Sequence, residues 1–148
     1  PQSQTPDAKT ARAVTDSPLP WLVKTKLSSS RMHRELAALA VARLARNDPR
    51  MAAEQLEKMA ARLQADEKGW AWGQIGWQAA RQHMPEALDW FARAGEAPLS
   101  DEAAQWKVRA ALRAQDWGAV RVGIEKMPAA LAGPAGTGGP GVFHMSTR

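Results

Sequence analysis

The stretch KGWAWGQIGWQAARQH, residues 68–83, decides the fold. It places Trp70, Trp72 and Trp77 within eight residues, among Ala, Gln and Arg residues that favour helices. In an α-helix Trp70 and Trp77 share one face, because seven residues make nearly two turns, whereas Trp72 lies on the opposite side. A helix that is apolar on two sides is packed between neighbours, so we expect this one inside a helical stack.

The three rings allow two interpretations, a packed core or a platform for stacking on sugars or bases. A platform needs rings side by side in one groove, which opposite faces of a helix do not provide. We therefore interpret Trp70 and Trp77 as core residues and leave Trp72 open between the two interpretations. Gly73 and Gly76 fit close contact with a neighbouring helix, since glycine inside a helix otherwise costs about 1 kcal/mol.

Helical patterns extend on both sides of this stretch, from residue 31 to residue 127. The second helix of each expected hairpin begins near Pro49, Pro85 and Trp117, which are 36 and 32 residues apart. A hairpin that recurs at such a period is typical of an α-solenoid. We predict an all-α fold: a superhelical solenoid fragment of about three tetratricopeptide-like hairpins with irregular termini. The expected helix-start signals are Asp48 with Pro49, Asp66 with Glu67, Pro85, Ser100 and Asp116.

The chain divides into three predicted parts. Residues 1–30 contain four prolines and are expected to be an irregular segment. Within it, only PWLVKTKL has enough apolar residues to dock on the helical domain as a short segment. Residues 31–128 form the predicted helical superhelix domain. Residues 129–148 are expected to be a Gly/Pro-rich disordered tail. No signal peptide is visible, and no apolar run has the length of a membrane span.

Charge argues against a nucleic-acid partner. The chain has a formal charge of +5, but residues 31–128 carry 15 basic and 13 acidic side chains, a net of +2. A nucleic-acid-binding protein usually concentrates basic residues on one face, whereas here each predicted helix carries both signs.

No catalytic, cofactor-binding or metal-ligating residue is predicted. The chain has no cysteine, which removes thiolate metal sites, and His33, His83 and His144 are too far apart for a metal motif. His33 and His83 are expected to be solvated near helix ends. The acidic pairs Asp66-Glu67 and Asp101-Glu102 lie in predicted first turns, where helix capping explains them.

Part of the chain resembles the tetratricopeptide repeat. Trp72, Ile75 and Gly76 match its W-x2-L-G element, and residues of the next helix match its second helix. The turn between the two is one residue shorter than that repeat allows.

A longer resemblance covers residues 31–128. The blocks RELAALAVARLARNDPRMAAEQLEKM, WGQIGWQAARQHMPEALDWFARA and LSDEAAQWKVRAALRAQDWGAVRVGIEKMP are similar, in this order, to the helical superhelix of soluble lytic transglycosylases. These are periplasmic enzymes that cleave peptidoglycan (murein) glycan strands. In that family the superhelix is a scaffold, and a separate domain carries the catalytic Glu before a Ser and a GLMQ-like segment. Neither motif occurs here, so no catalytic residue is carried over.

The resemblance implies a non-catalytic scaffold portion of a periplasmic enzyme that acts on murein, and this chain is expected to be inactive alone. The abrupt change to AGPAGTGGPGVFHMSTR after residue 131 suggests a truncated or frameshifted product. A second hypothesis is a stand-alone tetratricopeptide-like module that binds a partner protein in its groove. A third is an independent murein-binding domain, which requires Trp72 or Trp106 to be exposed in a groove.

Overall fold

The structure, a computed structural model, describes residues 7–127, and over that range the chain is all-helical, as predicted. Its elements are α1 (Ala8–Asp16), α2 (Pro18–Lys24), α3 (Arg31–Ala45), α4 (Pro49–Met59), the 3₁₀ turn η1 (Ala60–Arg62), α5 (Ala65–Arg81), α6 (Ala87–Ala94), α7 (Asp101–Arg113) and α8 (Trp117–Glu125). The chain forms two compact units, divided after Pro98, so α1–α6 belong to the first and α7–α8 to the second. None of the helices in the described range has the length and apolar character needed to cross a membrane.

Side-chain caps set most helix starts. Asp48, Ser100 and Asp116 each accept a hydrogen bond from the backbone N–H three residues further on, at 3.0 or 3.1 Å. Each bond satisfies one of the backbone donors that the first helical turn leaves open. The starts predicted at these three positions are confirmed, with Pro49 in the first turn of α4.

The predicted start of α6 at Pro85 is wrong by two residues. Helix α5 ends at Arg81, His83 beyond it has φ 59°, and the N–H of Met84 bonds back to the carbonyl of Ala79. After this closing turn, the carbonyl of Met84 accepts from the N–H of Ala87, three residues further on, which is the bond of a turn. Pro85 therefore lies in a turn, and regular α-helix begins at Ala87.

The N-terminal segment differs from its prediction. Residues 1–30 were expected to be irregular, yet α1 and α2 occupy residues 8–24. Each helix has one buried residue, Val14 in α1 and Leu22 in α2, and both helices pack on α3. Such short helices gain stability from docking rather than from their own sequence, which explains why their pattern was too weak to predict them.

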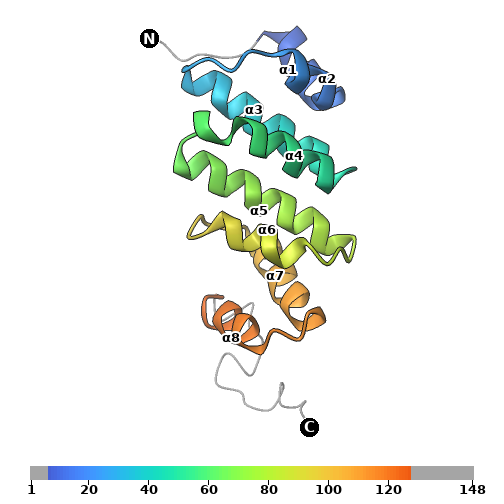
Figure 1. Cartoon of the computed structure of the whole chain (residues 1–148), viewed down its shortest axis with the longest axis vertical. Helices are drawn as coiled ribbons and strands as arrows, with labels where there is room; N and C mark the ends of the chain where they lie inside the picture. Colours follow the sequence, from blue (N-terminus) through green and yellow to red (C-terminus); the bar gives the residue numbers. More distant parts are fainter. Residues whose placement is uncertain (1–6, 128–148) are drawn as a thin grey trace. The chain divides into compact units, whose positions relative to one another are not determined.

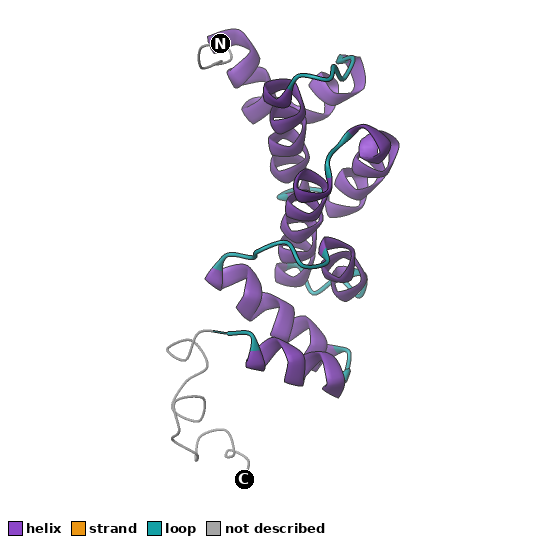
Figure 2. Ribbon diagram, turned by 90° about the vertical axis from the view of Figure 1, so that its left-hand side faces the viewer, coloured by secondary structure: helices purple, strands orange, loops and turns teal. Residues whose placement is uncertain are grey.

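Helix α5 is the centre of the first unit. It packs against α3, α4 and α6, as Figures 1 and 2 show, so the predicted position between neighbours is confirmed. Phe91, Leu56, Ile75 and Val41 are the largest side chains that are fully buried. A Cβ added at Gly76 would lie 2.8 Å from the Phe91 ring, so α5 and α6 approach each other only because residue 76 has no side chain.

The hairpins α3–α4 and α5–α6 contact each other in a regular register. Arg50 donates to Glu86 at 2.7 Å, Arg93 donates to Glu57 at 2.6 Å, and the Gln82 amide donates to the Arg46 carbonyl at 3.4 Å. In all three contacts the partners are 36 residues apart, which equals the spacing from Pro49 to Pro85. The second hairpin therefore stacks on the first one repeat further along the chain.

The second unit is a hairpin of α7 and α8. It buries Ala103, Val108 and Ala111 of α7, and Gly123 of α8 lies against the Val108 side chain. Three large apolar side chains of this hairpin are exposed: Leu112, Trp117 and Val122. The domain predicted over 31–128 thus contains the division between the units, and a solenoid running through all three hairpins stays a prediction. The tail predicted over 129–148 lies outside the described residues.

Candidate functional site: the Trp72 cleft

The tryptophans of α5 differ in burial from the expectation. Trp72, left open as a ligand platform, is 6% exposed, whereas Trp70 and Trp77, interpreted as core, are half-buried. The indole N–H of Trp77 is buried and has no hydrogen-bond partner among the described residues. Trp72 is more buried than expected because side chains from α4 and α6 cover its ring.

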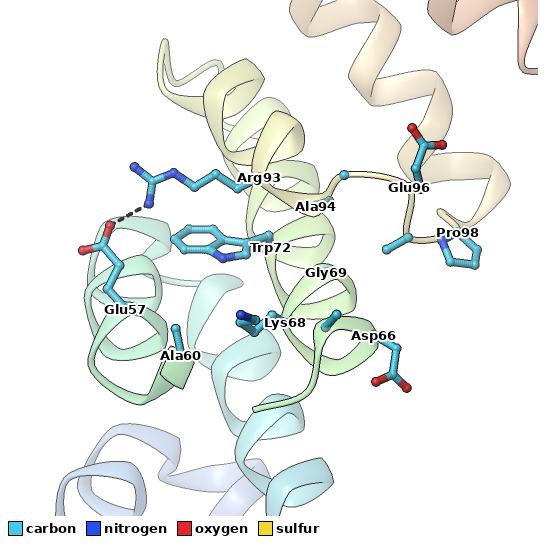
Figure 3. Close-up of a pocket in the computed structure, with 13 residues that line it drawn as sticks. Glu57, Ala60, Asp66, Lys68, Gly69, Trp72, Arg93, Ala94, Glu96 and Pro98 are labelled. Atoms are coloured by element: carbon cyan, nitrogen blue, oxygen red, sulfur yellow. Dashed lines mark hydrogen bonds and ion pairs between the residues drawn. The ribbon is translucent and has the colours of Figure 1, made fainter. Parts of the chain in front are cut away.

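Trp72 is covered by an ion pair that bridges two helices. The Arg93 guanidinium of α6 lies 4.7 Å from the centroid of the indole ring, and its Nη1 donates to Glu57 Oε2 of α4 at 2.6 Å (Figure 3). A cation over an aromatic face is attracted by the ring's negative face. The pair therefore joins α4, α5 and α6 around one ring.

Beside Trp72 lies a cleft of about 740 Å³, which we call the Trp72 cleft. The end of α4, the start of α5, and the end of α6 with the chain that follows it line the cleft, all within the first unit. This volume is within the range typical of ligand sites. Its lining residues are Glu57, Ala60, Ala65, Asp66, Lys68, Gly69, Trp72, Arg93, Ala94, Gly95, Glu96, Ala97 and Pro98.

Glycine shapes one wall of the cleft. A Cβ on Gly69 would come within 2.8 Å of the Ala97 Cβ and 2.9 Å of the Ala94 carbonyl oxygen, so the chain leaving α6 lies directly on α5. Gly95 has φ 62°, a backbone conformation that glycine adopts without steric cost, and it turns the chain away from α6. The wall formed by residues 94–98 is thus held against α5 by backbone contact.

The charged residues of the cleft are not equivalent. Glu57 is paired with Arg93, and Asp66 accepts from Arg31 at 3.3 Å. The Lys68 side chain has no hydrogen bond or ion pair within residues 7–127. Lys68 is half-buried and lies beneath the Trp72 ring in Figure 3, on the side opposite Arg93.

Glu67, next to the cleft residues, has a structural role. Its side chain is 4% exposed, accepts from Arg34 of α3 at 3.0 Å and accepts from the Gln64 N–H at 2.8 Å. The second bond belongs to the capping box that begins α5, so the capping interpretation is confirmed for Glu67, whereas Asp66 lies in the first turn and pairs with Arg31. Asp101 and Glu102 are exposed in the first turn of α7.

The histidines do not gather into a site. His33 is half-buried, so its predicted solvation is wrong: its Nδ1 accepts from the Ser28 N–H at 3.1 Å and its Nε2 lies 2.7 Å from Thr25 Oγ1. His83 is exposed after α5, and His144 lies outside the described residues. Residues 7–127 contain no cluster of three or more potential metal ligands.

A second, smaller hollow lies beside Trp70. It has a volume of about 470 Å³ and includes Leu39, which is 47% exposed. Its charged rim is engaged in ion pairs, since Arg31 contacts both Glu35 and Asp66. Trp106 of α7, the other ring considered for murein binding, is half-buried with Arg109 at 4.6 Å from its centroid.

Sequence reasoning singled out Trp72 but missed the pair that covers it, Arg93 and Glu57, and the cation beside it, Lys68. Arg93 and Glu57 lie 36 residues apart, and their exposed helical positions carry no local signal. The repeat spacing of 36 residues was the one available signal, because it places the two positions on stacked helices. Comparisons of the chain with protein-family models, with curated proteins and with solved structures found no match.

Proposed function

We propose that this chain is a non-catalytic helical scaffold that acts in peptidoglycan turnover in the periplasm. The observation that carries the proposal is the 36-residue register between the hairpins α3–α4 and α5–α6. Stacking of hairpins in register is how repeat proteins build extended surfaces for large ligands. The sequence blocks that resemble the superhelix of soluble lytic transglycosylases run along these same hairpins and along α7–α8.

The polar chemistry of the first unit is consistent with a scaffold. The carboxylates of Glu57, Glu67 and Glu86 are each bonded to an arginine on another helix. Such pairs hold helices together, whereas a glycosidase acid must face the bond that it cleaves. The proposal therefore places catalysis of murein cleavage outside these residues.

Co-sedimentation with purified murein sacculi tests the proposal. We expect the full chain to pellet with sacculi but not with cellulose, which is a glycan without peptide stems. We also expect no anhydro-muropeptides in the supernatant by mass spectrometry. A chain that stays in the supernatant, or one that releases anhydro-muropeptides, would contradict the proposal.

A second candidate function is a tetratricopeptide-like module that binds a peptide of another protein. The observation that favours it is the Trp72 cleft, in which small apolar residues and one aromatic ring lie beside Lys68, a cation with no ion pair within residues 7–127. The shift of the Trp72 indole N–H resonance on addition of short peptides to the folded chain tests this candidate. Peptides that leave the resonance unmoved at every concentration would exclude it for this cleft.

A further inference from the structure

The Trp72 cleft combines apolar walls with one cation, Lys68, that has no ion pair among the described residues. Trp72, Ala60, Gly69, Ala97 and Pro98 supply aromatic and aliphatic surface. The guanidinium of Arg93 is paired with Glu57, whereas the ammonium of Lys68 has no hydrogen bond or ion pair within residues 7–127.

The two other carboxylates of the lining do not serve as partners for Lys68. Asp66 is bonded to Arg31, and in Figure 3 the carboxylates of Asp66 and Glu96 both point away from Lys68. An ammonium that is half-buried beside apolar surface loses part of its hydration. A ligand carboxylate placed there would restore a charge-assisted hydrogen bond.

The backbone of one wall favours a peptide as the ligand. Residues 95–98 lie outside the helices, and the absence of a side chain at Gly69 lets this strip lie directly on α5. The N–H groups of Gly95 and Ala97 bond to the carbonyls of Ala92 and Ala94, and Pro98 has no N–H, so an extended peptide would pair with carbonyl oxygens of this strip. Side-chain contacts beside the strip would add specificity. A cleft of about 740 Å³ accommodates a few residues of such a peptide.

We propose that the Trp72 cleft binds an extended peptide segment in which a carboxylate adjoins an aliphatic side chain. Lys68 pairs with the carboxylate, and the aliphatic side chain packs against Trp72, Ala97 and Pro98. The Arg93–Glu57 pair keeps the Trp72 ring in place from the opposite side. This inference rests on the second candidate function and does not depend on the role in peptidoglycan turnover.

The test uses two peptides that differ in one group, acetyl-Leu-Asp-Ala-amide and acetyl-Leu-Asn-Ala-amide. Each is titrated into the full chain while the Trp72 indole N–H resonance is followed. We expect the Asp peptide to shift this resonance saturably and to bind at least about tenfold more tightly than the Asn peptide, because only a carboxylate pairs with the ammonium. Equal binding of the two peptides, or no binding, would overturn the proposal.

Variants separate Lys68 from general charge effects. Lys68→Gln keeps the aliphatic stem and removes the charge, so we expect it to abolish the preference for Asp over Asn. Lys26→Gln makes the same change in net charge at an exposed position outside the cleft, and we expect it to keep that preference. An unchanged preference in Lys68→Gln would contradict the role of Lys68.

A neutral sugar distinguishes this inference from the role in peptidoglycan turnover. Chitotriose that shifts the Trp72 resonance, when the Asp peptide does not, would assign the cleft to a glycan and overturn the peptide proposal. If the Asp peptide does not bind while the chain still sediments with sacculi, the inference is contradicted and the scaffold function is retained.

Discussion

At the scale of single residues, the pair Arg34–Glu67 shows what holds α3 to α5. Both side chains are at most 10% exposed, and each makes a further bond to backbone, Glu67 from the Gln64 N–H and Arg34 to the Ser29 carbonyl. A buried ion pair offsets its desolvation better when further hydrogen bonds satisfy its members, and here each member makes one such bond.

Removing one member of this pair is expected to be costly. Glu67→Ala leaves Arg34 buried without a counterion and removes the capping box of α5, so we expect a loss of about 3–5 kcal/mol in the free energy of unfolding. Glu35→Ala breaks an exposed pair with Arg31 and is the matched control, for which we expect little change. Chemical denaturation followed by circular dichroism measures both, and equal effects of the two variants would contradict the argument.

At the scale of elements, close approach of helices depends on positions without a side chain. The added Cβ of Gly76→Ala would come within 2.8 Å of the ring of Phe91, which is fully buried. We expect a loss of about 1–3 kcal/mol, as for other overpacked cores. The thermal unfolding midpoint measures this loss.

The control for this variant is Gly118→Ala in α8. There an added Cβ would meet only Asp116 Oδ1, at 3.7 Å, which is an ordinary contact. Because alanine favours helix over glycine, we expect this variant to be neutral or slightly stabilised. Destabilisation by Gly118→Ala of the size expected for Gly76→Ala would show that loss of glycine, rather than the clash with Phe91, is responsible.

The contact between α4 and the start of α6 depends on pH. The hydrogen bonds from Arg50 lower the pKa of Glu86 below its ordinary value of 4.5. A carboxylate with a lowered folded-state pKa contributes stability that is present above pH 4.5 and is lost as the pH falls through the lowered pKa. We expect Glu86→Gln to melt below the wild type at pH 7 and the difference to close towards pH 3, measured by thermal unfolding. A difference that persists unchanged at pH 3 would contradict this linkage.

At the scale of the whole molecule, the two units differ in how much core they bury. Helix α5 alone has ten buried residues, whereas α8 has none, and the exposed side chains of the second unit include Trp117 at 61%. Regions with few buried apolar contacts open at low free energy. We therefore expect backbone amides of α8 to exchange with solvent at least about 100-fold faster than those of central α5. Hydrogen exchange followed by NMR measures this, and equal protection of the two helices would contradict it.

Local signals explain what was predictable. The caps Asp48, Ser100 and Asp116 act within three residues of themselves, so their helices could be located from sequence. The same holds for the sandwiched position of α5, because apolar residues on two faces of a helix require neighbours on both. The start of α6 was misplaced because the hydrogen bond from the Met84 N–H to the Ala79 carbonyl, five residues back, competes with helix initiation at Pro85.

The sequence by itself determined the all-α fold of the described residues, most helix starts and the 36-residue spacing of the two stacked hairpins, because these follow from periodicity and from bonds between near neighbours. Only the tertiary structure decided that Trp72 is covered, that Lys68 has no ion pair in the part of the chain that the structure describes, and that α1 and α2 dock on α3. These outcomes depend on which side chains of separate helices meet. The Arg93–Glu57 pair joins residues 36 positions apart, and the sequence next to either residue does not indicate its partner.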